Sequence, residues 1–433
     1  MSAPYEILMT SDASGHLWNA CVWDIQTGAS LLTYRGGSTG PRTLCVLGGD
    51  YLIGADSNKP LLHLWSLQKK DQTQMRIVCP GRVTSLAVSP DGSYCVAGIA
   101  EKLHVWQVCS GNLLAVVSRH YQNINVIKFT DDGSHFISAA ADNLIIVWSL
   151  TSVVSLSAYS TGQSDPRHVW SSHSLPITDL HVGAGGVRAR VISSSLDHTC
   201  KLWDIASGSL LCTFVFDVGI SSITMDMAEF RIFAGGTNGN IFAVNMYGQP
   251  MKTERHISST ELEESGVTCF KGHEKQVTQL SVSLDGTRLV SGSHDCTCRL
   301  WDIFSGQCLR TLVHKGIVTN AFFMLTPQGI ANPDKPPMLP IQQFKRSLHM
   351  SSEADKNTTE TLDVRLQDNT NGADKLYRKP RDNSVTDILQ EEARLDLLQQ
   401  NTKTLSNEVA MLKAKNKQMY EFCVEHILNS KVK

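Results

Sequence analysis

The stretch FKGHEKQVTQLSVSLDGTRLVSGSHDCTCRLWDI, residues 270–303, carries the pattern that decides the fold. Within it, VTQLSVS (277–283) alternates apolar and polar residues, as a half-buried strand does. The LDG that follows is a tight-turn signal, because Gly accepts a positive φ. RLVSGS and TCRLWDI predict a second and a third strand, and CLRTL, beginning at Cys308, predicts an outer fourth. Such a sheet cannot bury enough apolar surface to stand alone and needs neighbours of its own kind.

Fainter copies of this unit recur toward the N-terminus. Strand-like runs end on Trp23, Trp65, Trp106, Trp148, Trp203 and Trp301. The intervals are 42, 41, 42, 55 and 98 residues, and the longest contains a degenerate copy, GNIFAVNM, in which Val244 and Asn245 occupy the Trp and Asp positions. A period of about 40–45 residues with four short strands per unit is the signature of a propeller of WD repeats. The sequence therefore predicts an all-β fold made of repeated blades.

The last unit resembles the WD-repeat family consensus almost residue for residue, in its segments KGH, SLDG, SGSHD and RLWDI. The resemblance implies a structural tetrad in which a His bonds the turn Asp, and a Ser and a Trp complete a buried chain of hydrogen bonds. Three units keep all four members: His120, Ser138, Asp142 and Trp148; His173, Ser193, Asp197 and Trp203; and His273, Ser291, Asp295 and Trp301. The sequence leaves open whether Ser195 and Ser293 serve in place of Ser193 and Ser291. The units of Trp65 and Trp106 lack the His and the Asp, so their blades are expected to depend more on apolar packing.

A His-Ser-Asp set also invites comparison with a hydrolase triad. The set recurs at the same position in several units, which a scaffold needs and an active site does not, and no Gly-x-Ser-x-Gly elbow accompanies it. The chain has no Cys-x-x-Cys and no Cys/His cluster with zinc spacing, and RGGSTGP lacks the Lys-Ser/Thr ending of a phosphate-binding loop. We therefore expect no enzymatic activity, no cofactor and no metal site.

The net charge of the chain indicates which partners it can attract, and its cysteines indicate the cellular compartment. A formal charge of −2 on 433 residues gives no whole-molecule attraction to nucleic acid or to an anionic membrane. RNA binding would need a local basic rim, for which the candidates are Arg35, Arg42, Lys69, Lys70 and Arg82. The 12 cysteines are scattered singly apart from Cys296 and Cys298, which are expected to share one strand face. Reduced thiols and the absence of a signal-peptide pattern favour the nucleus or the cytosol.

The two ends of the repeat region are expected to complete one blade together. The unit of Trp23 has room for three strands and lacks the innermost one, whereas an unassigned strand, residues 317–325, follows the last complete unit. Pairing of the two would close a ring of seven blades within residues 1–326 and remove exposed strand edges. Two insertions, 151–173 and 246–266, interrupt the repeat spacing; they are either tolerated loops or docking loops. Within the first, RHVW (167–170) is expected to resume as an outer strand.

Beyond the propeller the composition changes. Residues 327–381 are rich in proline and polar residues and predict a flexible linker, with MLPIQQF as a possible docking segment and YRKPR as a possible nuclear-import signal. Residues 382–429 predict a C-terminal coiled-coil α-helix that forms a parallel homodimer, with an amphipathic helix docked on the propeller or on a partner as the alternative. The residues expected at its self-association seam are Leu395, Leu398, Leu405, Val409, Leu412, Asn416 and Met419.

Four segments that are not repeat consensus narrow the resemblance further. LLTYRGG, SRHYQ, PRHVWS and LPITDLH, together with the heptad tail, are similar to the WD repeat-containing protein 18 family. That resemblance implies a non-catalytic scaffold or adaptor of the nuclear and nucleolar rixosome, which acts in large-ribosomal-subunit biogenesis and pre-rRNA spacer processing. The implied partners are a proline-, glutamate- and leucine-rich helical-repeat scaffold, testis-expressed protein 10, and, through the complex, midasin and pre-60S particles, in the nucleolus and nucleoplasm. The alternatives are an adaptor of a DNA-damage checkpoint or replication complex, and an RNA-binding propeller.

Overall fold

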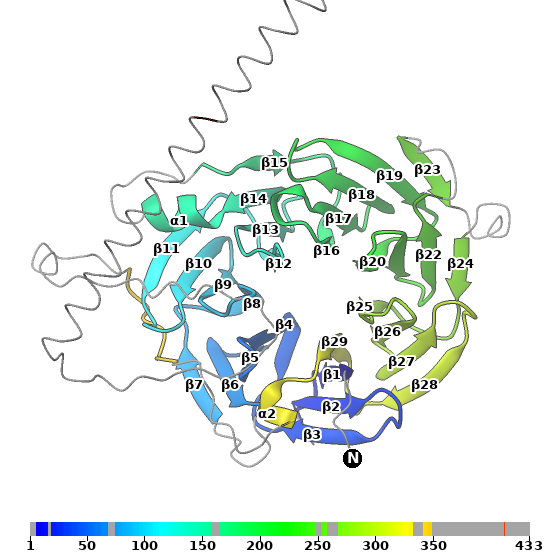
Figure 1. Ribbon diagram of the computed structural model, residues 1–433, viewed down its shortest axis with the longest axis horizontal. Helices are drawn as coiled ribbons and strands as arrows, with labels where there is room; N and C mark the ends of the chain where they lie inside the picture. The colour runs from blue at the N-terminus through cyan, green and yellow to red at the C-terminus, as the bar shows by residue number, and fades with distance from the viewer. Residues whose placement is uncertain are drawn as a thin grey trace, which may run out of the picture. The chain divides into compact units, whose positions relative to one another are not determined.

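The computed structural model describes residues 6–15, 19–67, 74–156, 165–247, 253–257, 267–331, 341–348 and Met411. The chain divides into two units, residues 1–363 and 364–433. The described part of the first unit is almost entirely β, and its strands form seven sheets arranged as blades around a channel (Figure 1). The predicted seven-bladed propeller is thus confirmed. Of the second unit, Met411 alone is described, as exposed and helical, and the expected coiled-coil residues lie outside the described residues.

The first four blades follow one another along the chain. Blade 1 contains β1 (Glu6–Asp12), β2 (Ala20–Asp24) and β3 (Ser30–Tyr34); blade 2 contains β4 (Thr39–Leu47), β5 (Tyr51–Asp56), β6 (Leu61–Ser66) and β7 (Gln74–Val78). Blade 3 contains β8 (Val83–Val88), β9 (Tyr94–Ile99), β10 (Lys102–Gln107) and β11 (Leu113–Ser118); blade 4 contains β12 (Ile124–Phe129), β13 (His135–Ala140), β14 (Ile145–Ser149) and β15 (His168–Trp170). In blades 2 to 4 the first strand lines the channel and the last lies outermost (Figure 1).

The remaining blades follow the same plan with one addition. Blade 5 contains β16 (Ile177–Val182), β17 (Arg190–Ser195), β18 (Thr199–Asp204) and β19 (Leu210–Phe216), with a short 3-10 helix at Gly186–Arg188. Blade 6 contains β20 (Ile220–Met225), β21 (Arg231–Gly236), β22 (Ile241–Asn245) and β24 (Val267–Phe270); blade 7 contains β25 (Val277–Val282), β26 (Arg288–Ser293), β27 (Thr297–Asp302) and β28 (Cys308–Val313). A strand outside this plan, β23 (Glu254–Ile257), lies at the outer edge of blade 5.

The apolar core lies between neighbouring blades. Phe136 and Trp148 of blade 4 are fully buried in one cluster with Val96 and Val105 of blade 3. Each middle strand buries both of its faces, which explains why its apolar residues run together rather than alternate strictly. Burial of apolar surface stabilises the fold by about 25 cal/mol per Å², so each blade depends on its two neighbours for most of its stability.

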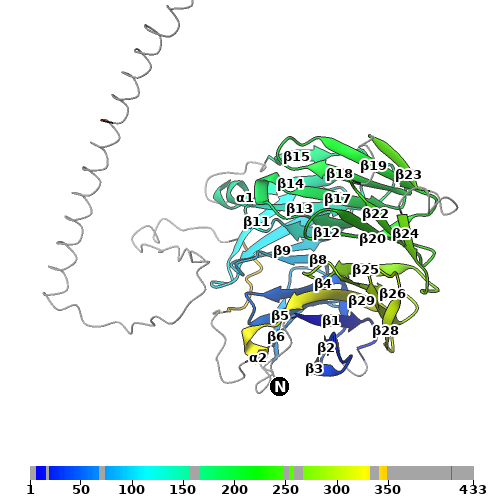
Figure 2. The same ribbon diagram turned by 45° about the vertical axis from the view of Figure 1, so that its right-hand side comes forward.

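The ring is closed by strands from both ends of the repeat region. Strand β29 (Val318–Leu325) pairs antiparallel with β1, from Glu6 opposite Leu325 to Ser11 opposite Asn320. The hydroxyls of Ser11 and Thr319 lie 2.8 Å apart across this seam. Blade 1 therefore has the order β29-β1-β2-β3, and Figures 1 and 2 show β29 beside β1 at the channel. Strands from the two ends of the repeat region thus share one sheet, which closes the ring.

The two insertions contain one helix and one strand that the sequence did not indicate, whereas the outer strand predicted at RHVW (167–170) is confirmed as β15. The first begins with a short helix, α1 (Leu150–Leu156), and then supplies β15 as the outer strand of blade 4. The second sends β23 across to blade 5, where it pairs parallel with β19 to make a five-stranded sheet. A four-residue strand has no usable periodicity, so only the unpaired edge of β19 explains why these residues become a strand.

Two expectations about local structure are wrong. The expected flexible linker over 327–381 includes α2 (Gln328–Ala331) and residues 341–348, whose Phe344 is 6% exposed and packs in the core of blades 2 and 3. The two neighbouring cysteines do not share a strand face. Cys296 lies in the turn before β27 with a φ of 64°, whereas Cys298 is buried within β27.

A buried histidine at the ring closure is expected to make stability depend on pH. His314 is 5% exposed and contacts Trp23 edge to face, and burial lowers its pKa to about 4. Between the ordinary value of about 6.5 and about 4, the unfolded chain binds a proton that the folded chain does not. The free energy of unfolding should therefore fall as the pH falls through this window, by about 3 kcal/mol from this group.

The measurement is urea unfolding, monitored by tryptophan fluorescence, at a series of pH values from about 7 to about 4.5, a range that covers most of that window. His314→Phe should show a shallower loss of stability than the unchanged chain. His256→Gln, which alters a histidine whose side chain is 74% exposed, should keep the original slope. Equal slopes for all three chains would contradict this role of His314.

Candidate functional site

The three predicted tetrads each join a loop to two strands of one blade. In blade 7, His273 lies before β25, Ser291 in β26, Asp295 in the following turn and Trp301 in β27. His273 Nδ1 lies 2.8 Å from Asp295 Oδ2, and His273 Nε2 lies 2.7 Å from Ser291 Oγ. Trp301 Nε1 donates to the same Ser291 Oγ at 2.8 Å. The four side chains thus form one continuous chain of hydrogen bonds.

The other two tetrads repeat this geometry closely. In blade 4 the three distances are 3.0 Å for His120–Asp142, 2.8 Å for His120–Ser138 and 2.9 Å for Trp148–Ser138. In blade 5 they are 2.9 Å for His173–Asp197, 2.8 Å for His173–Ser193 and 3.1 Å for Trp203–Ser193. The indole can only donate, so each Ser accepts from Trp and donates to His Nε2, which assigns the His proton to Nδ1, facing Asp.

The electrostatics of the tetrads fit a structural role. Burial raises the pKa of the carboxyls of Asp142, Asp197 and Asp295, but hydrogen bonds from the His and from neighbouring turn groups outweigh it and leave each pKa below its ordinary value. Burial also lowers the pKa of His273. A neutral His between a fixed carboxylate and a hydroxyl resembles a hydrolase triad in its parts. Here the Ser Oγ is buried and already accepts the indole N–H, so it is not presented to a substrate.

The structure distinguishes the two serines that the sequence left open. Ser195 Oγ donates to the carbonyl of Leu175 at 2.9 Å, and Ser293 Oγ donates to that of Lys275 at 3.0 Å. These two serines therefore bond the backbone of the loop before the blade, whereas Ser193 and Ser291 contact His and Trp.

Ser291→Ala is expected to lower the free energy of unfolding by about 1–3 kcal/mol, because it leaves a buried indole N–H and a buried imidazole nitrogen without their shared partner. Denaturant unfolding of the full chain measures the loss. Ser305→Ala, which alters an exposed serine after β27 of the same blade, is the matched control and should cost less. An unchanged midpoint for Ser291→Ala would show that the tetrad contributes nothing to stability.

In blades 1, 2 and 3, which lack a complete tetrad, the indole N–H of the tryptophan donates to an acceptor other than a tetrad serine. In blade 1, Trp23 Nε1 donates to Thr10 Oγ1 at 2.7 Å. Strand register puts Gly54 in blade 2 and Ala97 in blade 3 at the tetrad Ser position, and neither has a hydroxyl. Backbone carbonyls replace it: Trp65 Nε1 donates to the carbonyl of Arg35 at 3.0 Å, and Trp106 Nε1 donates to that of Lys345 at 2.9 Å.

The expectation that blade 2 lacks a His-Asp pair is wrong. His63 Nε2 lies 3.2 Å from Asp56 Oδ2, and both residues are buried. The His63 ring stacks on Trp65 with centroids 5.5 Å apart. The pair was missed because His63 lies within β6 and Asp56 ends β5, so neither occupies the consensus position.

A ring of polar side chains links the strands that line the channel. In six of the seven junctions, within the described residues, a hydroxyl or amide near the start of one inner strand donates to a carbonyl of the next. These donors and acceptors are Thr84 to Ile124, Asn125 to Ile177, Thr178 to Ile220, Ser221 to Val277, Thr278 to Val318 and Asn320 to Gly40, at 2.6–2.9 Å. At these six junctions, a hydrogen bond from a short polar side chain therefore links one blade to the next beside the channel.

Blade 2 replaces this link with an arginine that spans the channel. A bulge between Thr39 and Leu44 in β4 gives Arg42 a φ of 56°. Its Nε lies 3.0 Å from Asp179 Oδ1 of blade 5, and its Nη2 donates to the carbonyls of Ser221 at 2.8 Å and Thr278 at 3.2 Å. Arg42, Ser221 and Thr278 line a channel cavity of about 280 Å³.

This placement alters the candidate RNA-binding rim. Arg42 is committed to Asp179, so it is not a free cation of a basic surface. Arg35 and Arg82 are exposed, and Lys69 and Lys70 lie outside the described residues. The structure thus removes one of the five residues proposed for nucleic-acid binding.

The described residues hold neither a metal-binding cluster nor a membrane-spanning helix. No group of three or more His, Cys, Asp and Glu side chains in the described ranges could hold a metal ion. Among the helices described, none combines the length and the apolar character needed to cross a bilayer.

Comparison with known proteins agrees with the geometry. The family model described as "WD domain, G-beta repeat" matches residues 111–149, 164–204 and 265–302, the ranges that contain the three tetrads. The chain is 46% identical over 426 residues to WD repeat-containing protein 18 of Mus musculus, covering 98% of each chain. It is 45% identical over 432 residues to the Homo sapiens protein of that name, covering 99% of each. It is also 30% identical over 328 residues to pre-rRNA-processing protein pro-1 of Caenorhabditis briggsae, covering 74% of this chain and 61% of that protein.

Proposed function

This chain belongs to the WD repeat-containing protein 18 family, and on that premise we propose that it is a scaffold subunit that acts in pre-rRNA processing during biogenesis of the large ribosomal subunit. The observation that carries the proposal is similarity over nearly the whole chain, together with a relative named for pre-rRNA processing. The propeller itself is a scaffold-type fold, and its His, Ser and Asp side chains of catalytic type are engaged in hydrogen bonds within single blades.

The proposed partners follow from the family. We place the chain in a nuclear complex with a proline-, glutamate- and leucine-rich helical-repeat scaffold and with testis-expressed protein 10, acting near midasin on pre-60S particles. A rigid ring suits this role, since its many loops offer separate surfaces at fixed mutual distances. The proposed sites of action are the nucleolus and the nucleoplasm.

Depletion of the protein tests the proposed process. Cells that lose it should accumulate pre-rRNA that retains the second internal transcribed spacer, detected by hybridisation with a spacer probe, and should lose large subunits in sucrose gradients. Re-expression of the unchanged chain should restore both. A normal pre-rRNA pattern after depletion, or a defect confined to the small subunit, would reject the proposed role.

Self-association through residues 382–429 is a further part of the proposal. Leu405→Pro should abolish the dimer, because proline breaks a helix interior at a cost of about 3 kcal/mol or more. Light scattering on the full chain gives the mass, and circular dichroism tests whether the propeller stays folded. Leu405→Met, which keeps an apolar helix former at the seam, should remain dimeric. A dimer that survives Leu405→Pro would reject the coiled-coil interface.

A further inference from the structure

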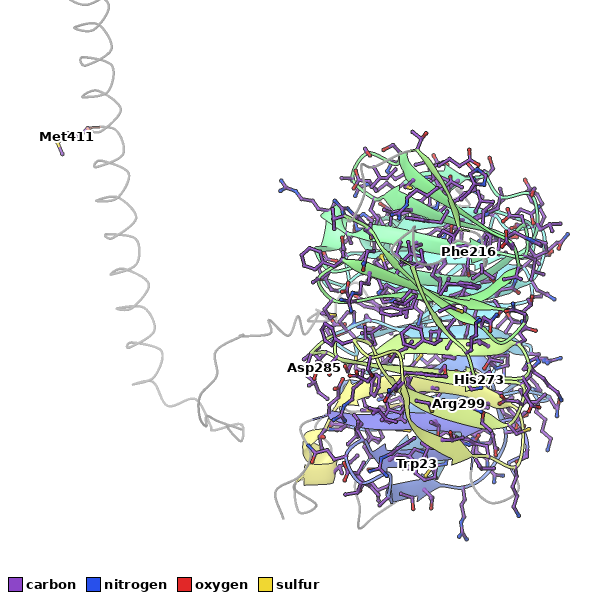
Figure 3. The ribbon with its side chains drawn as sticks, turned by 90° about the vertical axis from the view of Figure 1, so that its right-hand side faces the viewer. Trp23, Phe216, His273, Asp285, Arg299 and Met411 are labelled. Carbon is purple, nitrogen blue, oxygen red and sulfur yellow. The ribbon has the colours of Figure 1, made fainter. Side chains whose placement is uncertain are left out.

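An open apolar pocket lies between blades 6 and 7. Its cavity of about 450 Å³ is lined by the turns that follow β20, β22, β25 and β27. Five of its large side chains are strongly exposed: Met227 by 60%, Phe230 by 58%, Tyr247 by 51%, Leu284 by 46% and Phe304 by 71%. These turns are at the face opposite the tetrad histidines, and Figure 3 places Asp285 of this pocket well away from His273. Exposed apolar side chains gathered in one concave place are typical of a binding surface.

The aromatic residues occupy repeat positions that are polar or small in sibling blades. The turn 226–231 of blade 6 has the same backbone hydrogen bonds as the turn 283–288 of blade 7. In that alignment Phe230 corresponds to Thr287, and to Ser93 and Ser134 in blades 3 and 4. A hydroxyl therefore suffices for this turn, and the fold does not require Phe230.

The same comparison applies to the turns that follow the third strand of each blade. Phe304 and Tyr247 come three positions after Trp301 and after its counterpart Val244. The residues at that position in blades 1, 3, 4 and 5 are Gln26, Cys109, Thr151 and Ala206. Two adjacent blades thus share an aromatic side chain that those four blades lack, and both side chains face one pocket.

The corresponding junctions on either side are closed by contacts within the chain. Between blades 5 and 6, Arg190 Nη1 donates to the hydroxyl of Tyr247 at 2.6 Å. Between blades 7 and 1, Arg310 donates to the carbonyl of Thr27 at 2.6 Å. The junction of blades 6 and 7 keeps its cavity instead.

The charge of the pocket selects the kind of occupant. Asp226 and Asp285 line it, and Oδ1 of each accepts a backbone N–H of its own turn, which fixes the carboxylate in place. The one cation of the lining, Arg231, has its guanidinium 5.0 Å from the centre of the Phe304 ring. The contact orients the guanidinium but does not cancel its charge, so the lining carries two carboxylates and one guanidinium and is net negative.

We propose that this pocket binds a peptide segment of a partner protein that presents a large apolar or aromatic side chain next to Lys or Arg. The apolar side chain would fill the space between Phe230, Tyr247 and Phe304, and the cation would approach Asp226 and Asp285. The proposal rests on the scaffold role proposed above only for the class of partner, and the pre-rRNA assay tests that role separately.

Selection from a random peptide library displayed on phage tests the proposal with the full chain as bait. The same library is selected against Phe230→Ser/Phe304→Ala, which installs the sibling residues and should leave the blades folded, as thermal unfolding checks. We expect peptides that bind the unchanged chain and not the double variant, and that place an aromatic or large aliphatic residue beside Lys or Arg. A library that enriches no peptide dependent on the pocket, or enriches acidic or purely apolar ones, overturns the proposal.

A synthetic copy of the most enriched peptide then gives affinities by titration calorimetry. Phe304→Ala should weaken binding by about tenfold or more, as removal of a central aromatic anchor does. Asp285→Asn should weaken it and reduce its dependence on salt. Tyr121→Ser, which alters a 79% exposed aromatic residue outside this pocket, is the control and should bind normally. Equal binding by Phe304→Ala and Tyr121→Ser would overturn the assignment of the site.

Discussion

Arg42→Met is expected to lower the free energy of unfolding by about 3–5 kcal/mol, the cost of leaving one partner of a buried ion pair without the other. Asp179 is 2% exposed, and its carboxylate would keep only the N–H groups of Leu180 and Ile223, at 2.9 and 3.1 Å. The carbonyls of Ser221 and Thr278 would lose their shared donor as well. The arginine joins blade 2 to blades 5, 6 and 7, so its loss should loosen the whole ring.

Denaturant unfolding of three chains separates the ion pair from other effects. Arg82→Met removes an exposed arginine and should leave the unfolding midpoint nearly unchanged. The double variant Arg42→Met/Asp179→Asn removes both charges and should be more stable than Arg42→Met alone, because no buried charge remains unpaired. A single Arg42→Met variant as stable as Arg82→Met would refute the proposed role of the channel arginine.

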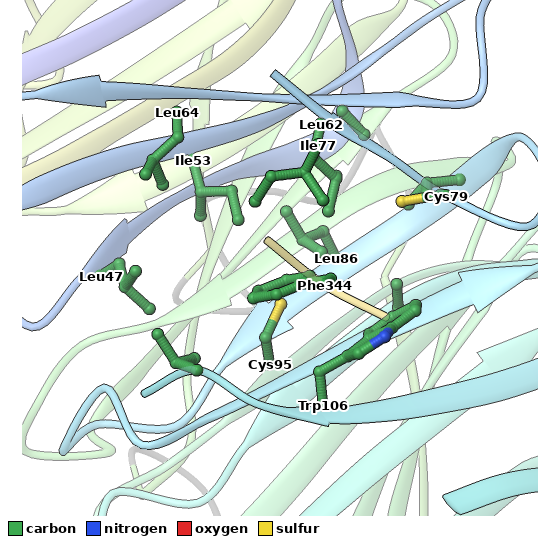
Figure 4. Packing of buried hydrophobic residues seen from close by; sticks show 14 of the residues in the cluster. Leu47, Ile53, Leu62, Leu64, Ile77, Cys79, Leu86, Cys95, Trp106 and Phe344 are labelled. Carbon is green, nitrogen blue, oxygen red and sulfur yellow. The ribbon is translucent and has the colours of Figure 1, made fainter. Parts of the chain in front are cut away.

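Phe344→Ala is expected to cost about 3–5 kcal/mol of stability, as large-to-small changes in a core do. Phe344 stacks on Trp106 with centroids 5.5 Å apart (Figure 4). His104 stacks on the same indole at the same distance. Lys345 accepts the indole N–H and donates its own N–H to the carbonyl of Gly111 at 2.7 Å. The segment 341–348 thus supplies blade 3 with a ring beside the Trp and an acceptor for its indole N–H, the roles that His and Ser have in a tetrad.

Thermal and denaturant unfolding measure this effect. Ser347→Ala, an exposed position of the same segment, is the matched control and should change stability by less than about 0.5 kcal/mol. Gly111→Ala is a second test, because a Cβ there would lie 2.3 Å from the carbonyl oxygen of Gln343 and its φ of +66° disfavours other residues. If Phe344→Ala and Gly111→Ala both have the same unfolding midpoint as the unchanged chain, segment 341–348 contributes nothing to the stability of the propeller.

Local patterns were sufficient to predict the blades. The Trp spacing predicted seven sheets, and the turn Asp and Gly positions indicated where strands reverse, because strands, tight turns and buried apolar faces depend on neighbours in sequence. The tetrad residues could be named from the family pattern, and the structure brings each set of four together. The His63–Asp56 pair escaped because it forms the same kind of contact from other positions of the blade.

Contacts between residues far apart in the chain could not be predicted. Arg42 looked like a surface cation because nothing near it in sequence indicates Asp179, which lies 137 residues away. Residues 341–348 looked like linker, since their apolar content is too small to form an element without the groove of blade 3. The polar and proline-rich composition around Phe344 is that of a chain with no core of its own.

The sequence by itself determined the number of blades, the family, and the His, Asp and Trp of each tetrad, because these depend on a pattern that repeats along the chain; which Ser completes the blade 5 and blade 7 tetrads was decided by the structure. The tertiary structure alone decided that Arg42 bonds Asp179 across the channel, that β23 pairs with β19 of blade 5 and that Phe344 stacks on Trp106 of blade 3. The physical reason is that a strand edge, a buried carboxylate and an open groove arise only when blades stand side by side. The segment that pairs with such an edge, neutralises such a carboxylate or fills such a groove is the one that the fold brings close to it, whatever its distance along the chain.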